Sequence, residues 1–152
     1  MKTLMSRLLL VFGLACVSFS SPAQTVSDPG DPGENRSSIA LATKFLQLID
    51  KGQKSETWPL TGPLLQGMVT RTSWIAGLES MRLPLGKLKA RTVDAAAFTA
   101  VIDGAPDGHY YVVFFTSQFE RAKVEEKVIL NLSKGEWDVE GYFITPIPAA
   151  SP

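Results

Sequence analysis

The spacing of apolar residues changes at Gly86, and this change constrains the fold more than any other feature of the sequence. Before Gly86, apolar residues recur at the three- and four-residue spacing of helices. After it they alternate as they do in strands. Helices followed by closely spaced strands are typical of an α+β domain and not of a parallel sheet. The sequence therefore predicts N-terminal helices packed on one face of a curved antiparallel sheet of four to five strands.

Three helices are expected in the first half of the chain. The first runs from Arg36 to just before Gly52, because a glycine commonly follows a helix end. The second starts at residues 61–63, where a proline fits the first turn. The third begins near Thr70 or Thr72 and carries an apolar face.

Strand-type alternation fills the second half of the chain. Its strongest segment is His109–Phe119, in which apolar side chains occupy both faces. Such a strand is central in its sheet, or one of its faces meets another subunit, so homodimerisation through the sheet is one hypothesis. The expected strands are Lys87–Val93, Phe98–Ile102, His109–Phe119, Lys123–Leu132 and Trp137–Ile144.

The N-terminus has the three-part layout of a secretory signal peptide. Lys2 and Arg7 precede an apolar run over residues 8–19, and small residues follow up to Ala23. Roughly a dozen apolar residues are too few to span a bilayer. We predict a signal peptide over residues 1–23, cleaved after Ala23, and a periplasmic or secreted protein without a membrane span.

A lipoprotein anchored through Cys16 is the alternative, because Leu14-Ala15-Cys16 resembles a lipid-attachment motif. Gly13 stands where that motif has a large aliphatic residue, and the apolar run continues past the cysteine. These departures favour the cleaved signal peptide.

Three parts are expected after the signal peptide. Residues 24–35 repeat Asp-Pro-Gly and offer almost nothing to bury, which predicts a flexible linker. Residues 36–145 have the length and patterning of a single α+β domain. Residues 146–152 are short and proline-rich, which predicts a disordered tail.

The composition excludes several kinds of site. With 15 basic and 15 acidic residues, the chain has no net charge that would attract nucleic acid. One cysteine and one histidine exclude an intramolecular disulfide and a Cys/His zinc site. No spacing of acidic residues resembles a calcium loop, and no nucleophile elbow or phosphate-binding glycine loop is present. We therefore expect no metal, no cofactor and no nucleic-acid partner, and we assign no catalytic residue.

A set of short segments in a fixed order resembles a known family. The segments are Trp58, Trp74, Gly77-Leu78, residues 82–91, residues 107–110, Phe115-Thr116, Phe119, residues 126–130 and residues 137–144. In this order and spacing they resemble the domain-of-unknown-function family 4019 of bacterial exported proteins, over about residues 36–145. The resemblance implies secretion and a cone-shaped fold similar to the nuclear-transport-factor-2-like (cystatin-like) superfamily. It implies no activity, cofactor or catalytic residue.

Glu126 is the most informative candidate for a functional residue. It shares one face of its strand with valines and leucines, so the alternation places it in the core. A buried carboxylate needs a cationic or hydrogen-bonding partner, and Arg91 and Arg82 are the candidates. Two interpretations stay open: a structural Glu–Arg pair, or a polar spot on the floor of a hydrophobic pocket that suits binding or acid–base work.

Trp74, Tyr110 and Trp137 complete the expected pocket, although large aromatic side chains more often fill a core. The only histidine, His109, lies at a strand start, where a histidine is more often simply exposed than catalytic.

These features favour an exported, non-enzymatic domain that binds a small apolar ligand or a protein partner. The alternative is a small isomerase- or hydratase-like enzyme that uses Glu126 in the cavity of the cone. This alternative depends on analogy with other proteins of that fold.

Overall fold

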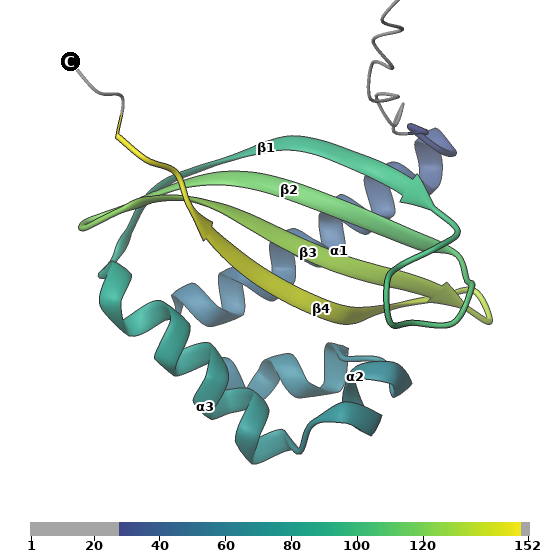
Figure 1. Cartoon of the computed structure of the whole chain (residues 1–152), viewed down its shortest axis with the longest axis horizontal. Coiled ribbons are helices and arrows are strands. Elements are labelled where there is room, and N and C mark those ends of the chain that lie inside the picture. Colours follow the sequence, from purple (N-terminus) through teal and green to yellow (C-terminus); the bar gives the residue numbers. More distant parts are fainter. Residues whose placement is uncertain (1–27, 150–152) are drawn as a thin grey trace, which may run out of the picture.

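The computed structural model describes residues 28–149 and shows helices followed by one antiparallel sheet (Figure 1). The predicted α+β class is confirmed, and the sheet has four strands in the order β1-β2-β3-β4. The predicted signal peptide and Cys16 lie outside the described residues. The elements are α1 (Pro32–Asp50), the 3-10 helix η1 (Lys54–Leu60), α2 (Pro63–Met68), α3 (Arg71–Arg82), the 3-10 helix η2 (Leu83–Leu85), β1 (Leu88–Thr99), β2 (Tyr110–Phe119), β3 (Lys123–Ser133) and β4 (Glu136–Pro146).

The first two predicted strands, Lys87–Val93 and Phe98–Ile102, are one continuous strand, β1. The pairing of β1 with β2 shifts register between Val93 and Ala95, so Asp94 is the extra residue of a β-bulge. The three residues after the bulge are all alanines, so apolar and polar side chains do not alternate there. For this reason the sequence pattern predicted two strands instead of one.

Helix α1 begins at Pro32, four residues before the predicted boundary at Arg36. The side chain of Asp31 accepts hydrogen bonds from the backbone N–H groups of Gly33 and Glu34, and a proline occupies the first turn. Both features stabilise a helix start. The last third of the predicted linker, residues 24–35, therefore belongs to the domain.

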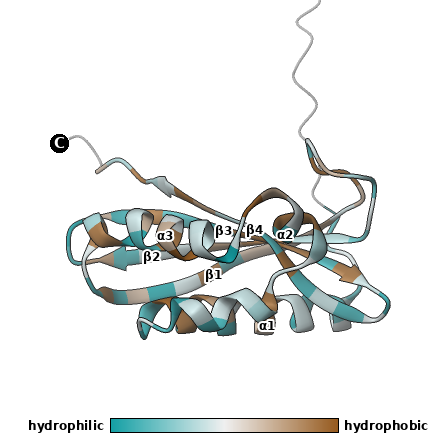
Figure 2. Ribbon diagram, turned by 90° about the horizontal axis from the view of Figure 1, so that it is seen from below, coloured by the Kyte–Doolittle hydropathy of each residue, from teal (hydrophilic) through white to brown (hydrophobic). Residues whose placement is uncertain are grey.

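The helices form two groups on the inner face of the curved sheet. Helix α1 crosses all four strands, and in Figure 1 it passes behind them. Helices α2 and α3 lie apart from α1, toward the β4 edge, as the view from below shows (Figure 2). The core fills the space between the two groups.

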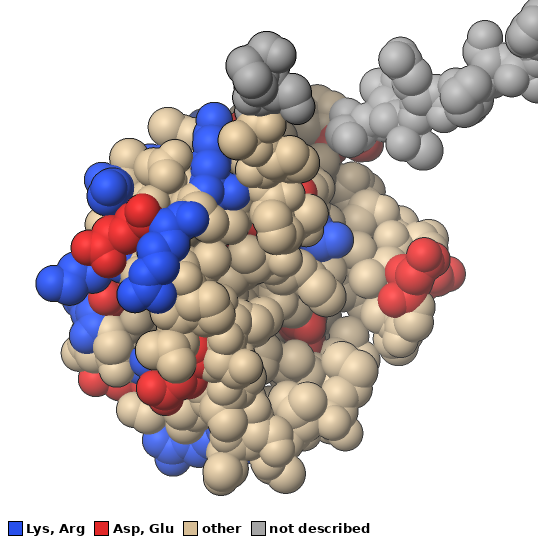
Figure 3. Space-filling model, turned by 60° about the vertical axis from the view of Figure 1, so that its left-hand side comes forward, with Lys and Arg blue, Asp and Glu red and all other residues tan. Residues whose placement is uncertain are grey.

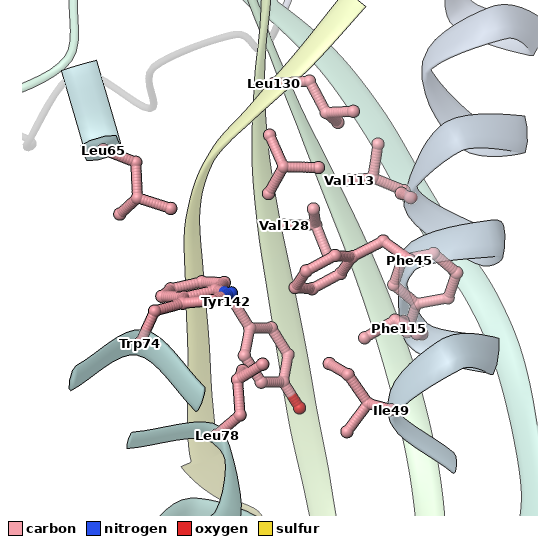
Figure 4. Packing of buried hydrophobic residues seen from close by; sticks show 13 residues of the cluster. Phe45, Ile49, Leu65, Trp74, Leu78, Val113, Phe115, Val128, Leu130 and Tyr142 are labelled. Atoms are coloured by element: carbon pink, nitrogen blue, oxygen red, sulfur yellow. The ribbon is translucent and has the colours of Figure 1, made fainter. Parts of the chain in front are cut away.

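The core combines α1, α3 and the inner face of the sheet (Figure 4). Phe45 of α1 is fully buried, and its ring lies 5.5 Å from the ring of Tyr142 and 6.1 Å from that of Trp74 (centroid distances). On β2, the inner-face residues are buried, whereas most outer-face residues remain partly exposed. The other buried apolar members of the cluster include Ala42, Leu46, Ile49, Leu65, Leu78, Val113, Phe115, Val128, Leu130 and Val139.

Candidate functional site

A cluster of four charged side chains lies where α1, α3, β1 and β3 meet. Its centre is Glu126 on β3, which has no exposed surface. Arg82 approaches one carboxylate oxygen at 3.2 Å, and Arg91 approaches the other at 2.7 Å. The pairing of Glu126 with these two arginines agrees with the sequence-based expectation.

Two hydroxyl groups complete the surroundings of Glu126. The Tyr142 hydroxyl donates to Oε1 at 2.6 Å, and the Ser117 hydroxyl donates to Oε2 at 2.5 Å. Both carboxylate oxygens are thus hydrogen-bonded and paired with a cation. A buried carboxylate needs such compensation to be tolerated.

Asp50, the last residue of α1, joins the two arginines on the side away from Glu126. Its oxygens lie 2.6 Å from a nitrogen of Arg82 and 2.6 Å from a nitrogen of Arg91. The cluster therefore contains two acids and two bases, and its charges balance. The sequence analysis missed Asp50, because a polar residue at a helix end looks exposed.

Burial and charge act together on the titratable groups of the cluster. Burial raises the pKa of the Tyr142 phenol well above its ordinary value, and the charge of Glu126 acts in the same direction. Burial alone would lower the pKa of Arg91, but the hydrogen bonds that it donates to Asp50 and the charge of Glu126 outweigh this effect, so the pKa is raised. Tyr142 and Arg91 therefore keep their protons over the physiological pH range.

An open cavity of about 700 Å³ lies beside the cluster. Asp50 and Arg82 belong to both the cluster and the cavity wall, whereas Glu126 does not line the cavity. The buried Nε of Arg82 has no hydrogen-bond partner in the described part of the chain, but its guanidinium carbon lies 4.8 Å from the centroid of the Phe119 ring. The lining residues are Ile49, Asp50, Lys54, Glu79, Arg82, Leu83, Gly86, Lys87, Leu88, Phe119, Glu120 and Arg121.

The lining of this cavity is mixed. Ile49, Leu88 and Phe119 provide apolar surface, while lysines and arginines alternate with acids around them. In Figure 3, which brings the left-hand side of Figure 1 forward, charged side chains of both signs gather on one side of the view. This cavity therefore differs from the hydrophobic pocket around Glu126 that the sequence suggested, because its lining is mixed and Glu126 is not part of it.

The three aromatic residues predicted to line a pocket lie elsewhere. Trp74 is in the core, and its indole N–H donates to the hydroxyl of Thr57 at 3.0 Å. Tyr110 is buried on the outer face, where its hydroxyl donates to the carbonyl of Pro106. None of the three lines the cavity, so a shared binding site for them stays a prediction without geometric support.

Trp137 belongs to an aromatic cluster at the other end of the sheet. Its ring packs against Tyr111 at 5.4 Å and against His109 at 6.4 Å (centroid distances). His109 Nε2 lies 2.7 Å from a carboxylate oxygen of Glu34 in the first turn of α1. His109 therefore connects the start of α1 to the sheet.

Glu140 is a second buried acid, which the sequence analysis did not single out. It is the extra residue at the register shift between β3 and β4, and its Oε2 accepts the backbone N–H of Leu65 at 2.8 Å. Its other oxygen, Oε1, is buried without a hydrogen-bond partner in the described part of the chain. Burial raises the pKa of Glu140, and the backbone hydrogen bonds offset part of this rise.

Glu140→Gln is expected to be at least as stable as the original chain at pH 7 and to lose this advantage at pH 4. Because the folded-state pKa of Glu140 is raised, the folded protein holds more protons than the unfolded chain between the two pKa values. The contribution of Glu140 to stability therefore falls as pH rises through this window. Urea unfolding at both pH values, with exposed Glu136→Gln as control, measures the effect. If the difference in stability between Glu140→Gln and the original chain were the same at both pH values, the expected effect of the raised pKa would be contradicted.

Comparison with known proteins gives one match. A family model described as "Protein of unknown function (DUF4019)" matches residues 41–142. No curated protein and no solved structure matches the chain. Over the described residues, none of the helices combines the length and apolar character needed to cross a membrane.

Proposed function

The chain belongs to the family of proteins of unknown function DUF4019, and from this premise we propose that it is an exported, non-enzymatic domain that binds a small amphipathic ligand. The ligand site is the cavity of about 700 Å³ beside the charge cluster. This volume lies within the usual range for small-molecule sites.

The lining of the cavity indicates a ligand with an apolar body and an anionic group. Ile49, Leu88 and Phe119 supply the apolar contact surface. Lys54 and Lys87 also line the cavity, and neither takes part in an ion pair within residues 28–149.

Two of the three acids of the cavity wall are already engaged, and the third, Glu79, is in no ion pair within residues 28–149. Asp50 holds the two arginines, and a carboxylate oxygen of Glu120 accepts the backbone N–H of Lys87 at 3.0 Å. The side-chain ammonium groups of the two lysines are thus available to a carboxylate or phosphate group. This changes the expected small apolar ligand into one that also carries an anionic group, because the cavity wall combines apolar and cationic side chains.

The surroundings of Glu126 favour binding over acid–base catalysis. A general acid or base must reach the substrate atom that gains or loses the proton. Glu126 has no exposed surface, and its oxygens are held by two arginines and two hydroxyl groups. An isomerase- or hydratase-like reaction at Glu126 would require this cluster to open.

The proposal also includes export from the cytoplasm and a nuclear-transport-factor-2-like fold. The three-part N-terminal pattern supports a periplasmic or secreted protein, with cleavage after Ala23 as its simplest processing. Helices on the inner face of one curved sheet support a nuclear-transport-factor-2-like cone, in which a cavity between helices and sheet is a usual ligand site.

Reversing the charges of Lys54 and Lys87 is expected to abolish ligand binding. The protein is purified gently from the periplasm of its producing cell, and its native mass spectrum is compared with that of the Lys54→Glu/Lys87→Glu variant. We expect an extra mass that disappears on denaturation, present in the original chain and absent from the variant. Lys44→Glu, at an exposed position of α1 outside the cavity, is the matched control and keeps the extra mass.

A synthetic pair of ligands tests the chemistry directly. Laurate and 1-dodecanol share an apolar chain but differ in charge, so we expect the double variant to lose about tenfold in laurate affinity, which corresponds to roughly 1.4 kcal/mol. Dodecanol binding should change by less than about twofold. Equal losses for both ligands would contradict recognition of an anionic group, and a ligand-free native mass would contradict a tightly bound ligand.

A further inference from the structure

The outer face of the sheet carries an apolar strip that no helix covers. One row across the four strands consists of Ala95, Phe114, Lys127 and Phe143, as the pairing registers show. The neighbouring row consists of Ala97, Val112, Ile129 and Gly141. Residues paired across an antiparallel sheet project from the same face, so these two rows form one surface, here called the outer strip.

Phe143 is the large exposed side chain of the outer strip, with 50% of its surface accessible. Its ring carbon is 3.1 Å from the position that a Cβ of Gly141 would occupy, so the ring lies over the glycine. Burying an exposed aromatic ring of this size is favourable, because it removes a large apolar area from water.

The side chains of the outer strip are large on β4 and small on β1. Strand β4 presents the large ring of Phe143, whereas β1 presents only the small side chains of Ala95 and Ala97. If a second copy is turned about an axis parallel to the strands, β1 faces β4. The ring of Phe143 then lies over Ala95 of the partner subunit. At both edges of the interface, a large side chain of one copy packs against small side chains of the other.

The charges of the outer face follow the same arrangement. Asp94 lies on the β1 side, where its Oδ2 accepts the hydroxyl of Thr116 at 2.6 Å. Lys127 lies on the other side, with its ammonium 4.8 Å from the centroid of the Phe143 ring. Neither residue is in an ion pair within the described chain. The same two-fold axis brings Lys127 of one copy toward Asp94 of the partner subunit.

We propose that a second copy of this chain covers the outer strip, with the two sheets packed face to face about a two-fold axis parallel to the strands. A two-fold interface requires a self-complementary surface, and the outer strip is complementary to itself in both shape and charge. The strand β2, apolar on both faces, then has its inner face in the domain core and its outer face in the dimer. This proposal does not depend on the ligand cavity, which lies elsewhere on the molecule.

The test uses four surface variants and a mixture of two of them. Sedimentation equilibrium of the purified protein from about 1 to 200 μM is expected to show a monomer–dimer equilibrium. Phe143→Glu should weaken the dimer at least tenfold, whereas Met68→Glu, at an exposed apolar residue of α2, should leave the dissociation constant within about twofold. Circular dichroism melting of each variant checks that it folds.

Charge-reversal variants test whether Lys127 of one copy lies opposite Asp94 of the partner subunit. Lys127→Glu alone places acid against acid at two symmetric contacts, and Asp94→Lys alone places base against base, so each should weaken the dimer about tenfold. An equal mixture of the two variants places opposite charges at both contacts and should restore dimers to within about threefold of the original affinity. A monomer at 200 μM, an unaffected Phe143→Glu dimer, or a mixture as weak as its components would overturn the proposal. The charge variants decide it even where Phe143→Glu does not fold.

Discussion

Replacing Glu126 with leucine is expected to lower the free energy of unfolding by about 3–5 kcal/mol, the cost of removing one partner from a buried ion pair. Leucine has a similar volume and suits the apolar neighbours of Glu126, so packing alone would tolerate it. The loss arises because Arg82 and Arg91 keep their charges in the core while only Asp50 remains to compensate them. Two hydroxyl groups also lose their acceptor.

Urea unfolding followed by tryptophan fluorescence measures this effect. Glu136→Leu, at the exposed first residue of β4, is the matched control and should change stability by less than about 0.5 kcal/mol. Glu126→Gln keeps the shape and one acceptor oxygen, so its loss of stability should lie between those of Glu126→Leu and Glu136→Leu. A Glu126→Leu variant as stable as the control would show that the arginines reach solvent without cost, and the cluster would then not be a structural element.

Much of the fold could be predicted because it depends on periodicity. The switch at Gly86 predicted the order of helices and strands, and alternation placed Glu126 on the buried face of β3. A buried acid requires cations, and this requirement led to Arg82 and Arg91. These predictions succeeded because each depended on local spacing or on one strong energetic rule.

Features that depend on contacts between distant segments were not predictable. Asp50 joins the cluster only because α1 ends where β1 and α3 approach it. Glu140 is buried because a register shift turns its side chain toward α2. The cavity, likewise, is a volume between elements, and the sequence gives the faces of elements but not the distances between them.

Phe45→Ala is expected to destabilise the protein by about 3–5 kcal/mol, the usual cost of truncating a fully buried phenylalanine. The ring contacts both Trp74 and Tyr142, so its removal leaves a cavity between the two groups of helices. Met68→Ala, at an exposed residue of similar size, should cost less than about 0.5 kcal/mol. Urea unfolding of both variants checks the difference.

The position of Phe45 also couples the apolar core to the charge cluster. Its ring supports Tyr142, whose hydroxyl donates to Glu126, so loss of the ring frees the tyrosine to move away from the carboxylate. Phe45→Ala and Tyr142→Phe should therefore be non-additive, with a coupling energy of about 0.5–3 kcal/mol in a double-mutant cycle. Additive effects would mean that Tyr142 keeps its hydrogen bond without support from Phe45. The charge cluster would then be stabilised independently of the core between α1 and α3.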